Sequence, residues 1–196
     1  CGLMGAGRSE ILRAIFGIDK KTSGEVFVEG KKVEIGSPQD AVREGIAMVT
    51  EDRLRQGVIY TMSVMRNATL AVFYKLVNRL GYNNVRKEKE VFLKKANDLS
   101  VKYSSPAALI GELSGGNQQK VIVERWLLTQ PKVMLLDEPT RGIDVGAKSE
   151  IYSLIDRLAA EGMAILMVSS EMPEIFAMCD RIMVVHEGEI VLEVNR

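Results

Sequence analysis

The stretch Leu113-Ser114-Gly115-Gly116-Asn117-Gln118-Gln119-Lys120 lies about one helix and one strand ahead of Val133-Met134-Leu135-Leu136-Asp137-Glu138. Ser114 and the two glycines are expected to open a helix that runs to about Thr129. Free backbone N–H groups and the positive dipole end of such a helix form an anion site, and glycine lets a ligand come close to the backbone. The tetrapeptide alone leaves a plainer alternative open, a helix N-cap on a Ser-Gly-Gly turn.

Together the two stretches resemble the signature motif and the Walker B strand of ATP-binding cassette (ABC) ATPases. The resemblance implies that Asp137 holds Mg²⁺, since hard cations prefer oxygen ligands, and that Glu138 acts as the general base for the attacking water. It implies a D-loop at Arg141–Asp144, in which Asp144 contacts the partner domain. The alternative for the acid pair is a helix cap after a strand. The signature residues, which would bind the γ-phosphate of ATP held by a partner domain, are Leu113, Ser114, Gly115, Gly116, Asn117 and Gln118.

Composition limits the possible classes of protein. A chain of 196 residues with 46% hydrophobic residues is one domain, or one large piece of one. Lys+Arg and Asp+Glu number 26 each, so the charge offers no support for a nucleic-acid surface. The cysteines Cys1 and Cys179 do not form a metal-type pair, which fits a reducing compartment. No apolar run is long enough to span a bilayer, so a membrane partner would have to be another chain.

Strands alternating with helices predict an α/β fold with a mostly parallel sheet flanked by helices. The resemblance identifies this fold as the ABC-type P-loop NTPase with an inserted helical subdomain. Residues 1–61 are expected to form the first part of a RecA-like core with a small β-hairpin, 62–116 the helical signature subdomain, and 117–196 the second part of the core. Helices are predicted over Val64–Val77 and Arg86–Leu99, buried strands over Ile46–Val49, Val133–Leu136 and Ala164–Ser169, and a solvated face at the charge run Arg86–Glu90.

The first ten residues read as a P-loop, Gly-x-x-x-x-Gly-Lys-Ser/Thr, with Arg8 where lysine is expected. The glycines preserve a backbone that can cradle phosphates, and Ser9 keeps the hydroxyl for Mg²⁺. A P-loop needs a buried strand immediately before it, so the first strand is expected to be missing from this sequence. The expected nucleotide-binding residues of the loop are Gly2, Gly5, Ala6, Gly7, Arg8, Ser9 and Glu10.

Four positions depart from the family pattern. Arg8 keeps a positive charge but is bulkier and planar, so it is not equivalent to lysine. Glu10 stands where the family usually has Ser or Thr, and meets like charge when nucleotide is bound. Glu51 stands at the Q-loop position and cannot donate a hydrogen bond when ionised. Ser170 replaces the switch histidine, whose imidazole would lend positive charge to the transition state.

All four departures fall on the domain's own nucleotide face, whereas the signature and Asp144 keep the family pattern. This combination, together with the stretch Glu51–Gly57 (Glu-Asp-Arg-x-x-x-Gly), resembles the second, C-terminal cassette of double-cassette bacterial monosaccharide importers. The resemblance implies a weakened pocket of its own and a signature that completes the pocket of a partner cassette. The alternative is a non-catalytic module for nucleotide binding and dimerisation.

The resemblance also implies cofactors, partners and a location. ATP and Mg²⁺ are the expected cofactors. The expected partners are a second cassette in the same full-length chain, membrane permease subunits and, indirectly, an extracytoplasmic sugar-binding protein, with no nucleic acid. The expected location is peripheral, at the cytoplasmic face of the plasma (inner) membrane. The isolated sequence is expected to hydrolyse ATP weakly or not at all.

Overall fold

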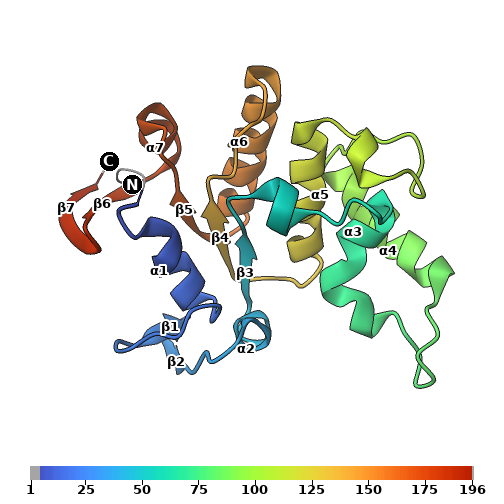
Figure 1. The fold of residues 1–196 in the computed structure, drawn as a ribbon, viewed down its shortest axis with the longest axis horizontal. Coiled ribbons are helices and arrows are strands. Elements are labelled where there is room, and N and C mark those ends of the chain that lie inside the picture. The colour runs from blue at the N-terminus through green and yellow to red at the C-terminus, as the bar shows by residue number, and fades with distance from the viewer. Residues whose placement is uncertain (1–4, 196) are drawn as a thin grey trace. The chain divides into compact units, whose positions relative to one another are not determined.

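A computed structural model describes residues 5–195 of the chain, in which helices and strands alternate (Figure 1). The described chain divides into two compact units: residues 5–51, 132–139 and 155–195 in the first, and 52–131 and 140–154 in the second. The three-part division expected from the sequence stays a prediction. The elements in chain order are α1 (Arg8–Ile15), β1 (Val26–Val28), β2 (Lys31–Val33), α2 (Pro38–Arg43), β3 (Ile46–Val49), a π-helical turn (Arg53–Gly57), α3 (Val64–Thr69), a 3-10 helix (Leu70–Lys75), α4 (Val85–Asp98), a 3-10 turn (Ile110–Glu112), α5 (Gly115–Leu127), β4 (Val133–Asp137), α6 (Val145–Ala160), β5 (Ala164–Val168), α7 (Met172–Met178), β6 (Arg181–His186) and β7 (Glu189–Asn195).

The first unit is built on a parallel sheet in the order β3-β4-β5. Val49 lies opposite Leu136, and Asp137 lies opposite Val168. Because the strands run in the same direction, their C-terminal ends meet at one edge of the sheet, the usual place for ligands in open α/β sheets. The unit also contains the antiparallel pairs β1-β2 and β6-β7.

Two of the three predicted buried strands are confirmed. β3 is buried along its whole length, and β4 is buried from Met134 to Asp137. β5 is confirmed as a strand, but the prediction that it is buried was wrong: Ala164 is exposed, the next three residues are partly buried, and within the strand only Val168 is buried. In the described part of the chain β5 pairs with β4 alone. Side chains of β5 line a cavity in the first unit.

The second unit is helical, and α5 lies at its centre. Most side chains of α5 are buried, and α3 and α4 pack against it (Figure 1). The helix predicted over Val64–Val77 is divided in the structure: α3 ends at Thr69, and a 3-10 helix continues to Lys75. None of the helices within residues 5–195 combines the length and the apolar character needed to cross a lipid bilayer.

The charge run Arg86–Glu90 is not wholly solvated, which corrects the sequence-based expectation. Its other members are exposed, but Glu88 is fully buried. Thr69 Oγ1 donates a hydrogen bond to Glu88 Oε1 at 2.8 Å, Asn83 Nδ2 donates to Oε2, and Arg66 Nε lies 3.4 Å from Oε1. A buried carboxylate is tolerated only when its oxygens are paired in this way. Glu88 therefore ties α4 to α3 and is part of the core.

Candidate functional site

The carboxyl edge of the parallel sheet brings predicted site residues of the first unit together. β4 ends at Asp137 and is followed by Glu138, while Ser169 and Ser170 follow β5. Helix α1 begins at Arg8, directly after the loop of glycines. Glu51 is partly buried and lies two residues after the end of β3, the remaining strand of this sheet.

Ser9 and Asp137 are in direct contact. Ser9 Oγ donates a hydrogen bond to Asp137 Oδ1 at 3.0 Å. Burial raises the pKa of Asp137 above its ordinary value, and the neighbouring Glu138 adds to the rise, while the Ser9 hydrogen bond opposes it. A desolvated carboxylate beside a hydroxyl is a set of oxygen donors that a cation would stabilise in its charged form. These two residues fit a Mg²⁺ site completed by water and phosphate oxygens.

Glu138 is held by two side chains of its own unit. Arg8 Nη1 lies 3.5 Å from Glu138 Oε1, and both side chains are at most 9% exposed. Ser170 Oγ donates a hydrogen bond to Glu138 Oε2 at 3.2 Å. Glu138 also has a φ of 47°, a conformation that non-glycine residues rarely adopt and that clusters at functional sites. Both carboxylate oxygens of the predicted general base are therefore engaged within the chain.

Arg8 is buried, and its guanidinium is directed at the sheet edge. Besides its ion pair with Glu138, Nη1 donates a hydrogen bond to the Ser169 carbonyl at 2.8 Å. A phosphate bound in the loop would have to compete with these partners for the charge of Arg8. The sequence predicted that Arg8 differs from a P-loop lysine, but not that it pairs with Glu138.

Within the described residues, two glycines of the predicted loop have a backbone conformation that requires glycine. Gly5 and Gly7 have φ values of 81° and 94°, which favour glycine. Gly188 N donates a hydrogen bond to the Ala6 carbonyl at 3.0 Å, which ties the loop to the β6-β7 turn. Glu10 is exposed in the first turn of α1. Gly2, also predicted to bind nucleotide, lies outside the described residues.

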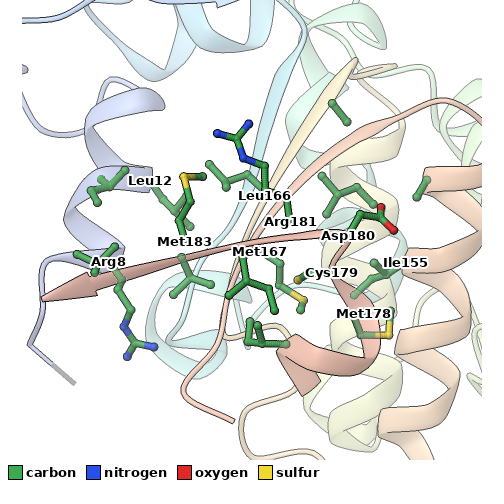
Figure 2. Close-up of a pocket in the computed structure, with 18 of the residues that line it drawn as sticks. Arg8, Leu12, Ile155, Leu166, Met167, Met178, Cys179, Asp180, Arg181 and Met183 are labelled. Atoms are coloured by element: carbon green, nitrogen blue, oxygen red, sulfur yellow. The ribbon is translucent and has the colours of Figure 1, made fainter. Parts of the chain in front are cut away.

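An apolar cavity of about 640 Å³ lies within the same unit, next to the candidate site. Figure 2 shows Leu12 of α1, Leu166 and Met167 of β5 and Met183 of β6 around it, with Arg8 at its margin. Its walls are mostly aliphatic and thioether side chains. Such walls suit an apolar segment, whereas phosphates need N–H groups and cations.

The second unit carries the signature residues at the start of α5. Ser114 is exposed and occupies the N-cap position, but its side chain caps no backbone N–H of the helix. Its Oγ accepts a hydrogen bond from Asn117 Nδ2 at 2.9 Å. The plain N-cap alternative would have Ser114 Oγ accept from the helix backbone, so the observed geometry does not favour it.

Buried signature residues hold the start of α5 in place through packing and hydrogen bonds. Leu113 is buried, and Gln118 Nε2 donates hydrogen bonds to the carbonyls of Ile110 and Leu113 at 3.3 and 3.1 Å. Gly115 is partly buried and Gly116 is buried. Ser114 is therefore exposed at the start of α5, while Leu113, Gly116 and Gln118 beside it are buried.

Asp144 is exposed and precedes α6. Its Oδ1 accepts a hydrogen bond from Ala147 N at 2.9 Å, and its carbonyl accepts one from Lys148 N at 3.0 Å. The predicted D-loop residue thus opens α6 in the way that Asp does at an N-cap. The same unit contains a side chain that the sequence analysis left without a role: Arg53, whose guanidinium reaches the backbone of Arg141 and Gly142. The stretch Glu51–Gly57 was noticed only as part of the resemblance.

The chain is similar to known proteins along its whole length. The model of the family described as ABC transporter matches residues 1–141. The ribose import ATP-binding protein RbsA of Geobacillus kaustophilus is 51% identical over 189 residues, which is 96% of this chain and 38% of that protein. RbsA of Rhodococcus jostii is 48% identical over 195 residues, 100% of this chain and 39% of that protein. The chain therefore spans about two fifths of the length of these curated relatives.

Solved structures show the same fold. A dimeric post-hydrolysis state of an ATP-binding cassette bound to ADP and Pi aligns with a TM-score of 0.80 and 24% identity, covering 99% of this chain and 82% of that chain. A nucleotide-free ATP-binding cassette from an ABC transporter aligns with a TM-score of 0.79 and 25% identity, covering 99% of this chain and 78% of that chain. The α/β prediction and its assignment to the ABC ATPase fold are confirmed.

Proposed function

The chain belongs to the ABC transporter family, and from this premise we propose that it is a nucleotide-binding cassette that helps to couple ATP to the uptake of a monosaccharide. The relatives named as ribose import ATP-binding proteins support the substrate class. The proposal places the chain as the second cassette of a longer polypeptide. Its partners would be the other cassette, permease subunits in the membrane and, through them, an extracytoplasmic sugar-binding protein. The cassette would work peripherally, at the cytoplasmic face of the inner membrane.

The observation that carries the proposal is the difference between the two sets of site residues. In the first unit, Arg8 and Ser170 occupy both oxygens of Glu138. In the second unit, Ser114 is exposed at the start of α5 and its side chain caps no backbone N–H there. A free helix N-terminus of this length attracts a phosphate. We therefore assign to this cassette a weakened pocket of its own and a signature that serves its partner's ATP.

Mg²⁺ and nucleotide fit the residues present in the first unit. Ser9 and Asp137 would hold the cation, which supplies charge neutralisation for the phosphates. Glu138 would orient and polarise water only after leaving Arg8 or Ser170, because these side chains engage both of its carboxylate oxygens. Serine at position 170 contributes a hydroxyl but no positive charge. The ion pair of Glu138 with Arg8 and the uncharged side chain at position 170 both predict slow hydrolysis in this pocket.

A second candidate function is a non-catalytic module that binds nucleotide and dimerises but leaves turnover to the other cassette. The ion pair between Arg8 and Glu138 favours it. The two candidates differ in the hydrolysis expected of the chain by itself. Hydrolysis well above background that disappears in Glu138→Gln would support an active pocket and reject the non-catalytic module. Background hydrolysis, unchanged by Glu138→Gln, would support the module.

The role of the signature is tested by Ser114→Arg in the complete transporter. A bulky side chain at the start of α5 would block the γ-phosphate of the partner's ATP, so ATP turnover should fall close to background. Ser104→Arg is the matched control, because Ser104 is an exposed serine of the same unit outside the signature. Normal turnover in Ser114→Arg would refute the use of this signature in trans. Equal losses in both variants would indicate a general effect of the added arginine.

A further inference from the structure

Residues Arg53–Gly57 form a single π-helical turn, and Asp52 caps its N-terminus. Asp52 Oδ1 accepts hydrogen bonds from Leu54 N and Arg55 N at 3.1 and 3.0 Å. This N-cap leaves the side chains of Arg53 and Arg55 pointing to different surroundings: Arg55 is exposed, and Arg53 is partly buried. π-helical turns are rare in proteins.

The Arg53 side chain runs between two glycines. A Cβ atom built on Gly57 would lie 3.5 Å from Arg53 Cγ and 2.7 Å from Ile122 Cδ1. A Cβ atom built on Gly115 would lie 3.1 Å from Arg53 Nη2. Larger residues at either position would compete with the guanidinium or its stem for space. The glycine of the Glu-Asp-Arg-x-x-x-Gly stretch and the first signature glycine therefore both make room for Arg53.

The guanidinium reaches the backbone of the D-loop. Nη1 donates a hydrogen bond to the Arg141 carbonyl at 3.4 Å, and Nη2 donates one to the Gly142 carbonyl at 3.5 Å. The Nε atom is buried and has no hydrogen-bond partner among the residues that the structure describes. A planar fork of donors can hold two successive carbonyls at once, which a lysine ammonium cannot do in the same geometry.

The D-loop side of the contact is also close-packed against α5. A Cβ atom on Gly115 would lie 3.6 Å from the Gly142 carbonyl oxygen, and one on Gly116 would lie 2.5 Å from Ala147 Cβ. The D-loop, the first turn of α6 and the first turn of α5 are therefore in mutual contact, with Arg53 at the point where they meet.

We infer that Arg53 is a positioning residue that holds the D-loop carbonyls of Arg141 and Gly142 against the start of α5. The D-loop and the signature then move as one piece with the π-helical turn. Only one consequence rests on the proposed function: Arg53 would position both elements, the D-loop and the signature, that a partner cassette uses. Arg53 itself touches no nucleotide in this account. It acts through the backbone of its neighbours.

Amide hydrogen exchange of the nucleotide-free protein tests the contact directly. Arg53→Ala removes two hydrogen bonds from a charged donor, so exchange should rise about tenfold in peptides covering 141–147 and 114–118. Arg53→Lys should leave an intermediate rise, because it keeps the charge and stem but not the fork. Arg55→Ala is the matched control: its guanidinium is 3.7 Å from Asp52 and its side chain is 88% exposed, so both peptides should exchange as in the wild type.

Different outcomes separate the inference from the proposed function. Unchanged exchange in either peptide of Arg53→Ala would overturn the inference, and so would a uniform rise that includes the β3 and β4 peptides. If Arg53→Ala does not fold, the intermediate rise in Arg53→Lys decides the question on the same terms. In the complete transporter, Arg53→Lys should lower kcat for ATP at an unchanged KM. Normal turnover of Ser114→Arg would instead reject the use of the signature in trans and leave the exchange result standing.

Discussion

Glu124, in the middle of α5, gives the sharpest test of how burial affects this protein. Its side chain is fully buried, and within the described part of the chain neither carboxylate oxygen has a hydrogen-bond partner. Burial raises the pKa of Glu124 to about 8, the nearby Lys95 opposes the rise, and Asp98 adds to it. Burial also raises the pKa of the nearby Tyr103 phenol, and Glu124 adds to that rise. A carboxylic acid in this setting is expected to be neutral at pH 7.

The direction of the pH dependence follows from the raised pKa. The unfolded chain releases the Glu124 proton near its ordinary pKa of 4.5, whereas the folded chain keeps it until the pH passes about 8. The stabilisation is complete below pH 4.5 and is lost as the pH rises to 8. The difference between the two pKa values corresponds to a loss on the order of 5 kcal/mol in the free energy of unfolding. The helical unit should thus be markedly less stable at pH 8 than at pH 5.

Urea denaturation between pH 5 and pH 8.5 measures this loss, with Glu124→Gln as the perturbation. Glutamine has the same shape and cannot ionise. The fall in the free energy of unfolding between pH 5 and pH 8.5 should therefore be smaller in Glu124→Gln than in the wild type, by most of that amount. The absolute stability of the variant is secondary, since a buried amide also lacks partners. Glu90→Gln, on the exposed face of α4, should keep the wild-type slope. Parallel curves for the wild type and Glu124→Gln would refute the reasoning.

Three further substitutions test particular contacts. Gly116→Ala places a Cβ atom 2.5 Å from Ala147 Cβ and should lower the free energy of unfolding, measured by thermal denaturation, by about 1–3 kcal/mol. The control Gly36→Ala, whose nearest contact would be at 3.7 Å, should lower it little. Glu88→Ala removes the acceptor of a buried network and should cost about 3 kcal/mol by urea denaturation, and equal stability to the exposed-site variant Glu90→Ala would contradict the network. Arg8→Lys loses the guanidinium that contacts Glu138 and the Ser169 carbonyl, and should bind a fluorescent ATP analogue more tightly. Unchanged or weaker affinity would argue that these partners do not compete with phosphate for the charge at position 8.

Much of the sheet and part of the site could be predicted from the sequence. Apolar runs followed by acidic residues predicted β3 and β4, and the alternation of strands and helices predicted that the sheet is mostly parallel, but the strand order came from the structure. The start of α5 was predicted within a few residues, because glycine and serine mark helix beginnings by their backbone chemistry. The burial of β5 was predicted wrongly, because an apolar run does not say whether another element covers it.

Long-range pairing was not predictable. The charge run Arg86–Glu90 gives no sign that one of its members is buried, because Glu88 is stabilised by Thr69 and Arg66 from another helix. The same holds for Arg8, whose partners Glu138 and Ser169 lie far along the chain. Charge and residue type are local properties, whereas the partner of a buried charge depends on which segments the fold brings together.

By itself the sequence determined the fold class and the family, and it predicted the positions of the phosphate loop, the acid pair and the signature, because these depend on residue type at close spacing along the chain. Only the tertiary structure decided that Arg8 engages Glu138, that Glu124 is buried with no hydrogen-bond partner among residues 5–195, and that Arg53 lies between Gly57 and Gly115 with its donors on the D-loop. These features depend on distances of a few ångströms between remote segments. The packing of the chain sets those distances, and no local pattern encodes them.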